Sequence, residues 1–208
     1  DEKGVILIFD EMITGFRFHL GGAQSLFGVI PDLATFGKGM ANGMPISAIV
    51  GNKQIMKKME DIFFSGTFGG ETLSLAAAKS TLLKMKKVDV ANYLYQVGQY
   101  LNDGIEKIIK DLNVSWLTFN GHPAWKVMSI SAGVNSLLYK SLLIQFLAEN
   151  GVLTIGSHNI SHSFTYADAD VVIRAYKISL NIISKKEAEG NLFTILRGEA
   201  IKPVFKIR

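Results

Sequence analysis

The first part of the chain alternates between short apolar runs and glycine-rich segments. Val5–Phe9 is a run of β-branched and aromatic residues that ends at Asp10-Glu11, and it predicts a buried strand. Leu33–Phe36 and Pro45–Val50 predict two more strands. The glycine-rich segment 13–30 predicts an irregular loop. Short strands of this kind, followed by helices, are typical of an α/β layer.

The middle of the chain has the spacing of helices. Asn52–Glu60 begins with a capping residue, and Glu71–Lys87 carries lysines in its last turn, which suits the helix dipole. Val90–Leu112 repeats apolar residues at helical intervals and predicts an amphipathic helix. Ser65–Gly70 is broken by glycines and predicts a loop just ahead of the second of these helices.

The pattern changes after Asn113, where segments that alternate like half-buried strands appear. An antiparallel hairpin, a helix, a short strand and a second helix opened by a capping box are expected. The hairpin is predicted at 116–120 with 126–131 and the first helix at 136–149. The short strand is predicted at 152–155, and the second helix at 169–184 after the capping box Thr165–Asp168. We therefore expect a domain boundary near residue 113, with part of an α/β layer in residues 1–113 and a small α+β domain in residues 114–208.

Composition narrows the classes of protein. The 208 residues are 48% hydrophobic, which is enough for a real core, and contain no cysteine, which excludes disulfides and thiolate metal sites. Lys and Arg number 22 against 18 Asp and Glu, and no basic run is interleaved with aromatics, so we expect no nucleic-acid partner. The apolar runs fall far short of the roughly 20 residues that span a bilayer. We expect no membrane association and a reducing cytoplasm as the location.

Three positions carry candidate chemistry. Asp10 follows a predicted strand, where it binds a ligand cation or caps the next turn. Lys38 lies between two glycines, so it is a nucleophile or an ordinary turn lysine. Ser65–Gly70 precedes a helix, where it binds a phosphate or is a flexible connector. Together the three match the pyridine nitrogen, the aldehyde and the phosphate of pyridoxal phosphate (PLP).

Several segments strengthen this hypothesis through a family resemblance. Phe9–Arg17, Gly21–Gln24, Pro31–Lys38 and Asn42–Pro45 resemble the class III (ω-type) PLP-dependent aminotransferases, and most of all their glutamate-1-semialdehyde 2,1-aminomutase branch. The resemblance is specific over residues 5–80 and fainter to about residue 185. It implies the C-terminal half of a fold type I PLP-transferase, in which residues 1–113 belong to the large mixed-sheet domain.

The resemblance also implies roles for individual residues. Asp10 would pair with the protonated pyridine nitrogen, and Met12 would pack on the face of the ring. Lys38 would hold the cofactor as a Schiff base and then act as the general acid and base. Gly66 and Thr67 would bind the cofactor phosphate, in this family usually that of the neighbouring subunit. The implied assembly is a homodimer with active sites shared across the interface.

Two departures from the family pattern bear on activity. Chains of this family are about twice as long, and the absent half supplies further cofactor contacts, so this chain alone should not hold PLP productively. Segment 156–162 lacks the acid of the aminomutases and the substrate-binding arginine of many ω-aminotransferases. This favours transamination of another substrate, sugar-like or otherwise non-dicarboxylic, between a small-molecule amino donor and a carbonyl acceptor. Aminomutation and a non-catalytic half remain alternatives.

Three further polar residues have two interpretations each, and a fourth has one. His158 and His162 contact substrate, or are loop residues satisfied by backbone groups. Arg17 lies near the site entrance or braces its loop, and His122 before Pro123 is expected in a turn.

Overall fold

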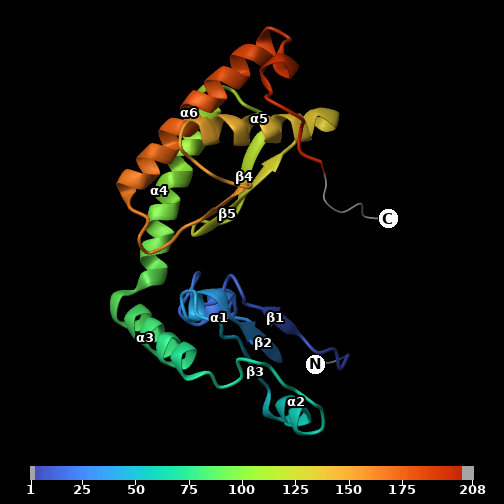
Figure 1. Ribbon diagram of the computed structural model, residues 1–208, viewed down its shortest axis with the longest axis vertical. Helices are drawn as coiled ribbons and strands as arrows, with labels where there is room; N and C mark the ends of the chain where they lie inside the picture. The colour runs from blue at the N-terminus through green and yellow to red at the C-terminus, as the bar shows by residue number, and fades with distance from the viewer. Residues whose placement is uncertain (1–2, 203–208) are drawn as a thin grey trace. The chain divides into compact units, whose positions relative to one another are not determined.

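The computed structural model describes residues 3–202 and divides into two compact units, Asp1–Leu94 and Tyr95–Arg208 (Figure 1). The division lies earlier than the change of pattern near residue 113, because most of helix α4 (Val90–Asp111) is counted with the second unit. A β-carbon on Gly98 of this helix would lie 2.2 Å from the carbonyl oxygen of Pro123, so the helix packs directly on the turn of a following hairpin. The assignment of 1–113 and 114–208 to two domains stays a prediction.

The first unit is built on a three-stranded sheet of order β1-β2-β3. Strand β1 runs parallel to β2, and β2 runs antiparallel to β3. The elements in chain order are β1 (Ile8–Asp10), α1 (Gly22–Phe27), β2 (Leu33–Phe36), the 3-10 helix η1 (Lys38–Met40), β3 (Ala48–Gly51), α2 (Lys53–Met56), the 3-10 helix η2 (Lys57–Glu60) and α3 (Thr72–Val88). The Asn52 side chain accepts the Gln54 N–H at 2.8 Å, which confirms Asn52 as the cap of α2.

A small apolar core joins the sheet of the first unit to helix α3. Its buried members are Ala34, Phe36, Met40, Ala41 and Ala78. Because Met40 and Ala41 lie two and three residues after Lys38, this core anchors the segment that carries the lysine. Contacts between η1 and α3 complete that anchor.

The prediction that Val5–Phe9 is a buried strand is wrong for this chain. The strand is limited to Ile8–Asp10, and the side chains of Val5 and Ile8 are 73% and 57% exposed. The reason is the position of β1 at the edge of its sheet, where it pairs only with β2 among residues 3–202. The apolar run therefore keeps an open edge and uncovered side chains.

The second unit is an antiparallel sheet of order β4-β5-β6 covered by helices (Figure 1). After α4 come β4 (Leu117–His122), β5 (Trp125–Ile130), the 3-10 helix η3 (Gly133–Asn135), α5 (Ser136–Glu149), β6 (Ser157–Asn159), α6 (Tyr166–Ala188) and the 3-10 helix η4 (Leu192–Ile195). Leu117 and Phe119 of β4 are buried while Thr118 and Asn120 are exposed, so one face of this sheet is covered. Helix α5 packs against both α6 and β5.

Most predicted elements of the second unit are confirmed. The hairpin pairs Leu117 with Ile130, and the capping box joins the side chains and backbones of Thr165 and Asp168 at the start of α6. The strand predicted at 152–155 is wrong, because strand β6 forms at Ser157–Asn159 instead. Among residues 3–202, no helix is both long and apolar enough to cross a membrane.

Candidate active site

Asp10 lies at the carboxyl end of β1, opposite Thr35 of the parallel strand β2. Its Oδ1 atom accepts the Met12 N–H at 3.0 Å and the Thr35 hydroxyl at 3.4 Å. Its Oδ2 atom has no hydrogen-bond partner within residues 3–202, and the side chain is exposed. A carboxylate oriented by two neighbours is thus available at the sheet edge where ligands of α/β proteins bind.

Lys38 lies at the carboxyl end of the neighbouring strand, β2, and is the first residue of η1. Its φ of 40° is in the left-handed region, which a residue with a β-carbon adopts only when the surrounding structure holds it there. The buried Met40 and Ala41 supply that restraint. The Lys38 side chain is exposed and forms no ion pair with any residue of the described chain.

Met12 links the two strand ends. A β-carbon on Gly37 would lie 2.4 Å from the Met12 Cε and 2.9 Å from its Sδ, so the methionine side chain lies directly against the backbone beside Lys38. Only glycine at position 37 leaves this space. The structure therefore brings together three of the residues predicted for the site, namely Asp10, Met12 and Lys38.

Gly66 and Thr67 lie elsewhere in the first unit. With Pro45–Ser47 and Glu71 they line a hollow of about 530 Å³, which Asp10, Met12 and Lys38 do not line. The sequence suggested that a phosphate would bind the hydroxyls and free N–H groups ahead of α3. Within α3 itself, the Glu71 side chain already accepts the N–H groups of Leu73 and Ser74, each at 2.7 Å. A phosphate at this loop would depend on the Thr67 hydroxyl and on N–H groups that precede the helix.

Glu11 is a residue of the site region to which the sequence assigned no role. Its side chain is 1% exposed and accepts the N–H groups of Ala23 and Gln24, at 2.9 and 2.8 Å, and the Thr14 hydroxyl. It thereby caps α1, the short helix inside a segment predicted to be an irregular loop. Two features of the sequence could have indicated this cap: an acid directly after an apolar run, and the pair Gly21-Gly22 further along the chain.

His158 is buried in the core of the second unit and belongs to strand β6, not to a loop. Its ring stacks on Phe119 at a centroid distance of 5.1 Å, and its Nε2 lies 2.9 Å from the Tyr176 hydroxyl oxygen. His162 is exposed in the loop before α6, and Arg17 is partly buried in the turn after Thr14. Contacts of His162 and Arg17 with substrate stay predictions. His122 ends β4 at the hairpin turn, where its Nδ1 accepts the Ala124 N–H at 3.2 Å.

Burial of His158 predicts an acid-sensitive fold. Burial lowers the pKa of His158 from 6.5 to about 4, so in the folded protein the ring stays neutral until about pH 4. The unfolded chain takes up this proton near pH 6.5. The free energy of unfolding therefore has its highest value above that pH and decreases as the pH falls towards 4. The expected loss is about 3 kcal/mol. Urea unfolding at several pH values measures it.

Two variants test the source of this pH dependence. His158→Phe removes the titrating group and should flatten the curve between pH 6.5 and 4, whereas His162→Gln, at an exposed position, should keep the original slope. Equal slopes in His158→Phe and the unsubstituted protein would show that another group causes the effect.

The fold of this chain is that of the fold type I PLP-dependent transferases. The chain belongs to the aminotransferase class-III family, whose sequence model matches residues 1–173.

Two curated relatives illustrate the range of activities among similar proteins. The chain is 36% identical over 205 residues to a glutamate-1-semialdehyde 2,1-aminomutase of Methanosphaera stadtmanae, covering 88% of this chain and 47% of that protein. It is 33% identical over 186 residues to a 3-aminobutyryl-CoA aminotransferase of Cloacimonas acidaminovorans, covering 86% and 44%. The chain thus spans about half the length of the curated relatives it matches.

Solved structures show the same fold. The PLP internal aldimine form of the FumI protein from Sphingopyxis sp. MTA144 superposes with a TM-score of 0.81 at 25% identity, over 90% of this chain and 45% of that one. An omega-transaminase from Sphaerobacter thermophilus superposes with a TM-score of 0.79 at 21% identity, over 86% and 45%.

Proposed function

We propose that this chain is the C-terminal half of a PLP-dependent aminotransferase and that Lys38 is the lysine that binds the cofactor. The observation that carries the proposal is the position of Asp10 and Lys38 at adjacent carboxyl ends of the parallel strands β1 and β2. Family membership supports it, because the family model covers both residues. Amino-group transfer is the activity that follows.

The residues around Lys38 fit this cofactor. Asp10 offers an oriented carboxylate with an unused oxygen, which suits a protonated pyridine nitrogen. The glycines on both sides of Lys38 leave the backbone accessible, and Met12 offers an apolar contact next to it. When bound, PLP supplies an aldehyde that takes up the amino group and a ring that accepts electrons.

Each residue of the site then has a defined task. Lys38 Nζ, once the amino donor has displaced it from the cofactor, would accept the proton that leaves the Cα of that donor. Asp10 would hold a positive charge on the ring nitrogen by pairing with it, and Met12 would offer an apolar contact to the ring. The left-handed backbone conformation of Lys38 fixes the point and direction in which its side chain leaves the chain.

The active form requires more protein than this chain. The open edge of β1 and the uncovered Val5 and Ile8 suit a neighbouring strand from the other half of the fold, on the same or on a second polypeptide. We use the term assembled enzyme for this chain together with that half. A cytoplasmic location agrees with the absence of cysteines.

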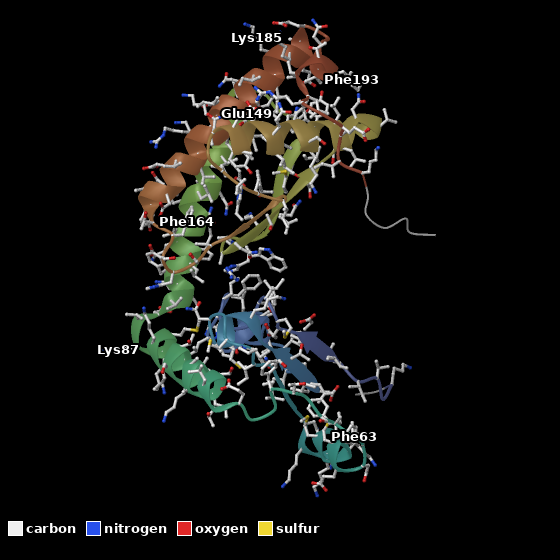
Figure 2. All side chains as sticks on the ribbon, viewed as in Figure 1. Phe63, Lys87, Glu149, Phe164, Lys185 and Phe193 are labelled. Atoms are coloured by element: carbon white, nitrogen blue, oxygen red, sulfur yellow. The ribbon has the colours of Figure 1, made fainter. Side chains whose placement is uncertain are left out.

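A homodimer with shared active sites is the proposed assembly. Gly66 and Thr67 would bind the phosphate of the cofactor held by the neighbouring subunit, which agrees with their place in a hollow that Lys38 does not line. Exposed aromatic side chains lie within this loop and just ahead of it. Phe63, after η2 (Figure 2), and Phe68 are 96% and 60% exposed, as expected of a surface that another subunit covers.

Intramolecular amino transfer is the second candidate activity. It is favoured by the 36% identity to a glutamate-1-semialdehyde 2,1-aminomutase. Against it, segment 156–162 lacks the acid that the aminomutases present there, which favours transamination of another substrate. A non-catalytic half is the remaining alternative, and the retention of Asp10, Lys38 and Thr67 counts against it.

An amino-donor screen distinguishes these activities. The assembled enzyme loaded with PLP is mixed with a panel of amino donors and a keto-acid acceptor, and separately with glutamate 1-semialdehyde alone. Amino transfer that requires an external donor supports the aminotransferase. Formation of 5-aminolevulinate without a donor shows the aminomutase, and no reaction with any amine shows the non-catalytic half.

A further inference from the structure

The Glu11 carboxyl group is enclosed by hydrogen-bond donors of the chain itself. Two backbone N–H groups of α1, from Ala23 and Gln24, and the Thr14 hydroxyl donate to its two oxygens. The side chain is 1% exposed and takes part in no ion pair within the described part of the chain. A buried acid is retained at low cost only when its acceptor sites are filled, as they are here.

The backbone of Glu11 joins the strand ends that carry the site. Its N–H donates to the Thr35 carbonyl oxygen at 2.9 Å, which extends the pairing of β1 and β2 by one residue beyond Asp10. Its own carbonyl accepts the Gly15 N–H at 2.9 Å and starts the turn that follows. Glu11 is therefore fixed by β2 through its backbone and by α1 through its side chain.

The contact between Glu11 and α1 is tight. A β-carbon on Gly22 would lie 2.5 to 2.8 Å from the Glu11 carboxyl atoms, and the φ of Gly22 is 81°. Glycine is thus required there both for space and for backbone conformation. The start of α1 cannot move towards or away from β1 without breaking hydrogen bonds to the Glu11 side chain.

We propose that Glu11 is a positioning residue that fixes Asp10 and Met12 against the cofactor, and this rests on the proposed function. Asp10 and Met12 are the direct neighbours of Glu11, and neither side chain is buried. Their positions follow from the backbone between them, which Glu11 holds to β2 and α1. If the Glu11 side chain loses its hydrogen bonds to α1, the Asp10 carboxylate shifts relative to the ring nitrogen, although Lys38 still binds the cofactor.

Glu11→Gln tests this in the PLP-loaded assembled enzyme. An amide places an NH2 donor where the carboxylate accepts from the three donors. We expect kcat to fall about 10- to 100-fold while KM changes little, because misplacement of a reacting group lowers the rate. The pH at which the visible absorbance of the bound cofactor changes should shift in the same direction as in Asp10→Asn. Thr14→Val, which removes one donor only, should give a smaller change of the same kind.

A control separates positioning from general stability. Asp168→Asn makes the same chemical change at the cap of α6 in the second unit, and it should lower the melting temperature without changing kcat or the absorbance titration. If Glu11→Gln and Thr14→Val behave like Asp168→Asn, Glu11 is only structural and the proposal is wrong. If the unsubstituted enzyme itself binds no PLP, the proposed function fails first, and the two failures are thereby distinguished.

Discussion

Lys38→Ala is expected to reduce amino transfer by the assembled enzyme at least about 10²- to 10⁴-fold, the range for loss of a positioned general acid and base. The variant also loses the covalent link to the cofactor. The fold should be retained, because the Lys38 side chain is exposed and replacing it leaves no buried partner without a contact. The measurement is the rate of keto-acid formation at saturating PLP.

Two comparisons make the Lys38 result specific. A small primary amine added to the solution should partly restore the rate, because it can take over the proton transfer. Lys53→Ala removes another exposed lysine of the same unit and should leave the rate unchanged. A Lys38→Ala enzyme with more than about a tenth of the original rate would contradict the assigned role.

Asp10→Asn is expected to lower kcat about 10²- to 10³-fold, as removal of a preorganised charge next to the reacting system does. The amide oxygen can still accept from the Met12 N–H and the Thr35 hydroxyl, so the local structure and the amount of bound PLP should change little. What is lost is the negative charge that keeps the pyridine nitrogen protonated. Steady-state kinetics and cofactor content measured on the same preparation check both parts.

Thr35→Val is the matched control for Asp10. It removes the hydroxyl that donates to the same oxygen at 3.4 Å but leaves the charge of Asp10 in place. A hydrogen bond of this length contributes less than about 1 kcal/mol, so kcat should change less than about fivefold. If Asp10→Asn lowers kcat no more than Thr35→Val does, the charge of Asp10 has no part in the reaction.

Local signals predicted much of the fold. The cap at Asn52, the capping box of Thr165 and Asp168, and the alternation of β4 each depend on residues close together in the sequence, and all three are confirmed. Asp10 and Lys38 were predicted near one sheet edge because the carboxyl ends of parallel strands meet there, and Met12 lies beside Gly37; the roles of all three stay predictions.

The errors concern features set by distant residues. Helix α1 was missed because its capping group is the Glu11 side chain, whose hydrogen bonds cross 12 and 13 positions of the sequence. Burial of His158 depends on Phe119 and Tyr176, which lie on other elements. The apolar run Val5–Phe9 is typical of an enclosed strand, but its enclosure depends on neighbours beyond those that residues 3–202 provide.

The most direct test of the account is to locate the bound cofactor on the chain. The assembled enzyme is loaded with PLP, reduced with borohydride to make the link to lysine permanent, digested and examined by mass spectrometry. The account predicts the cofactor mass on the peptide that contains Lys38 and on no other lysine of the 208-residue chain. Modification of a different lysine, or an unmodified Lys38 peptide from an enzyme that is active with PLP, would contradict it.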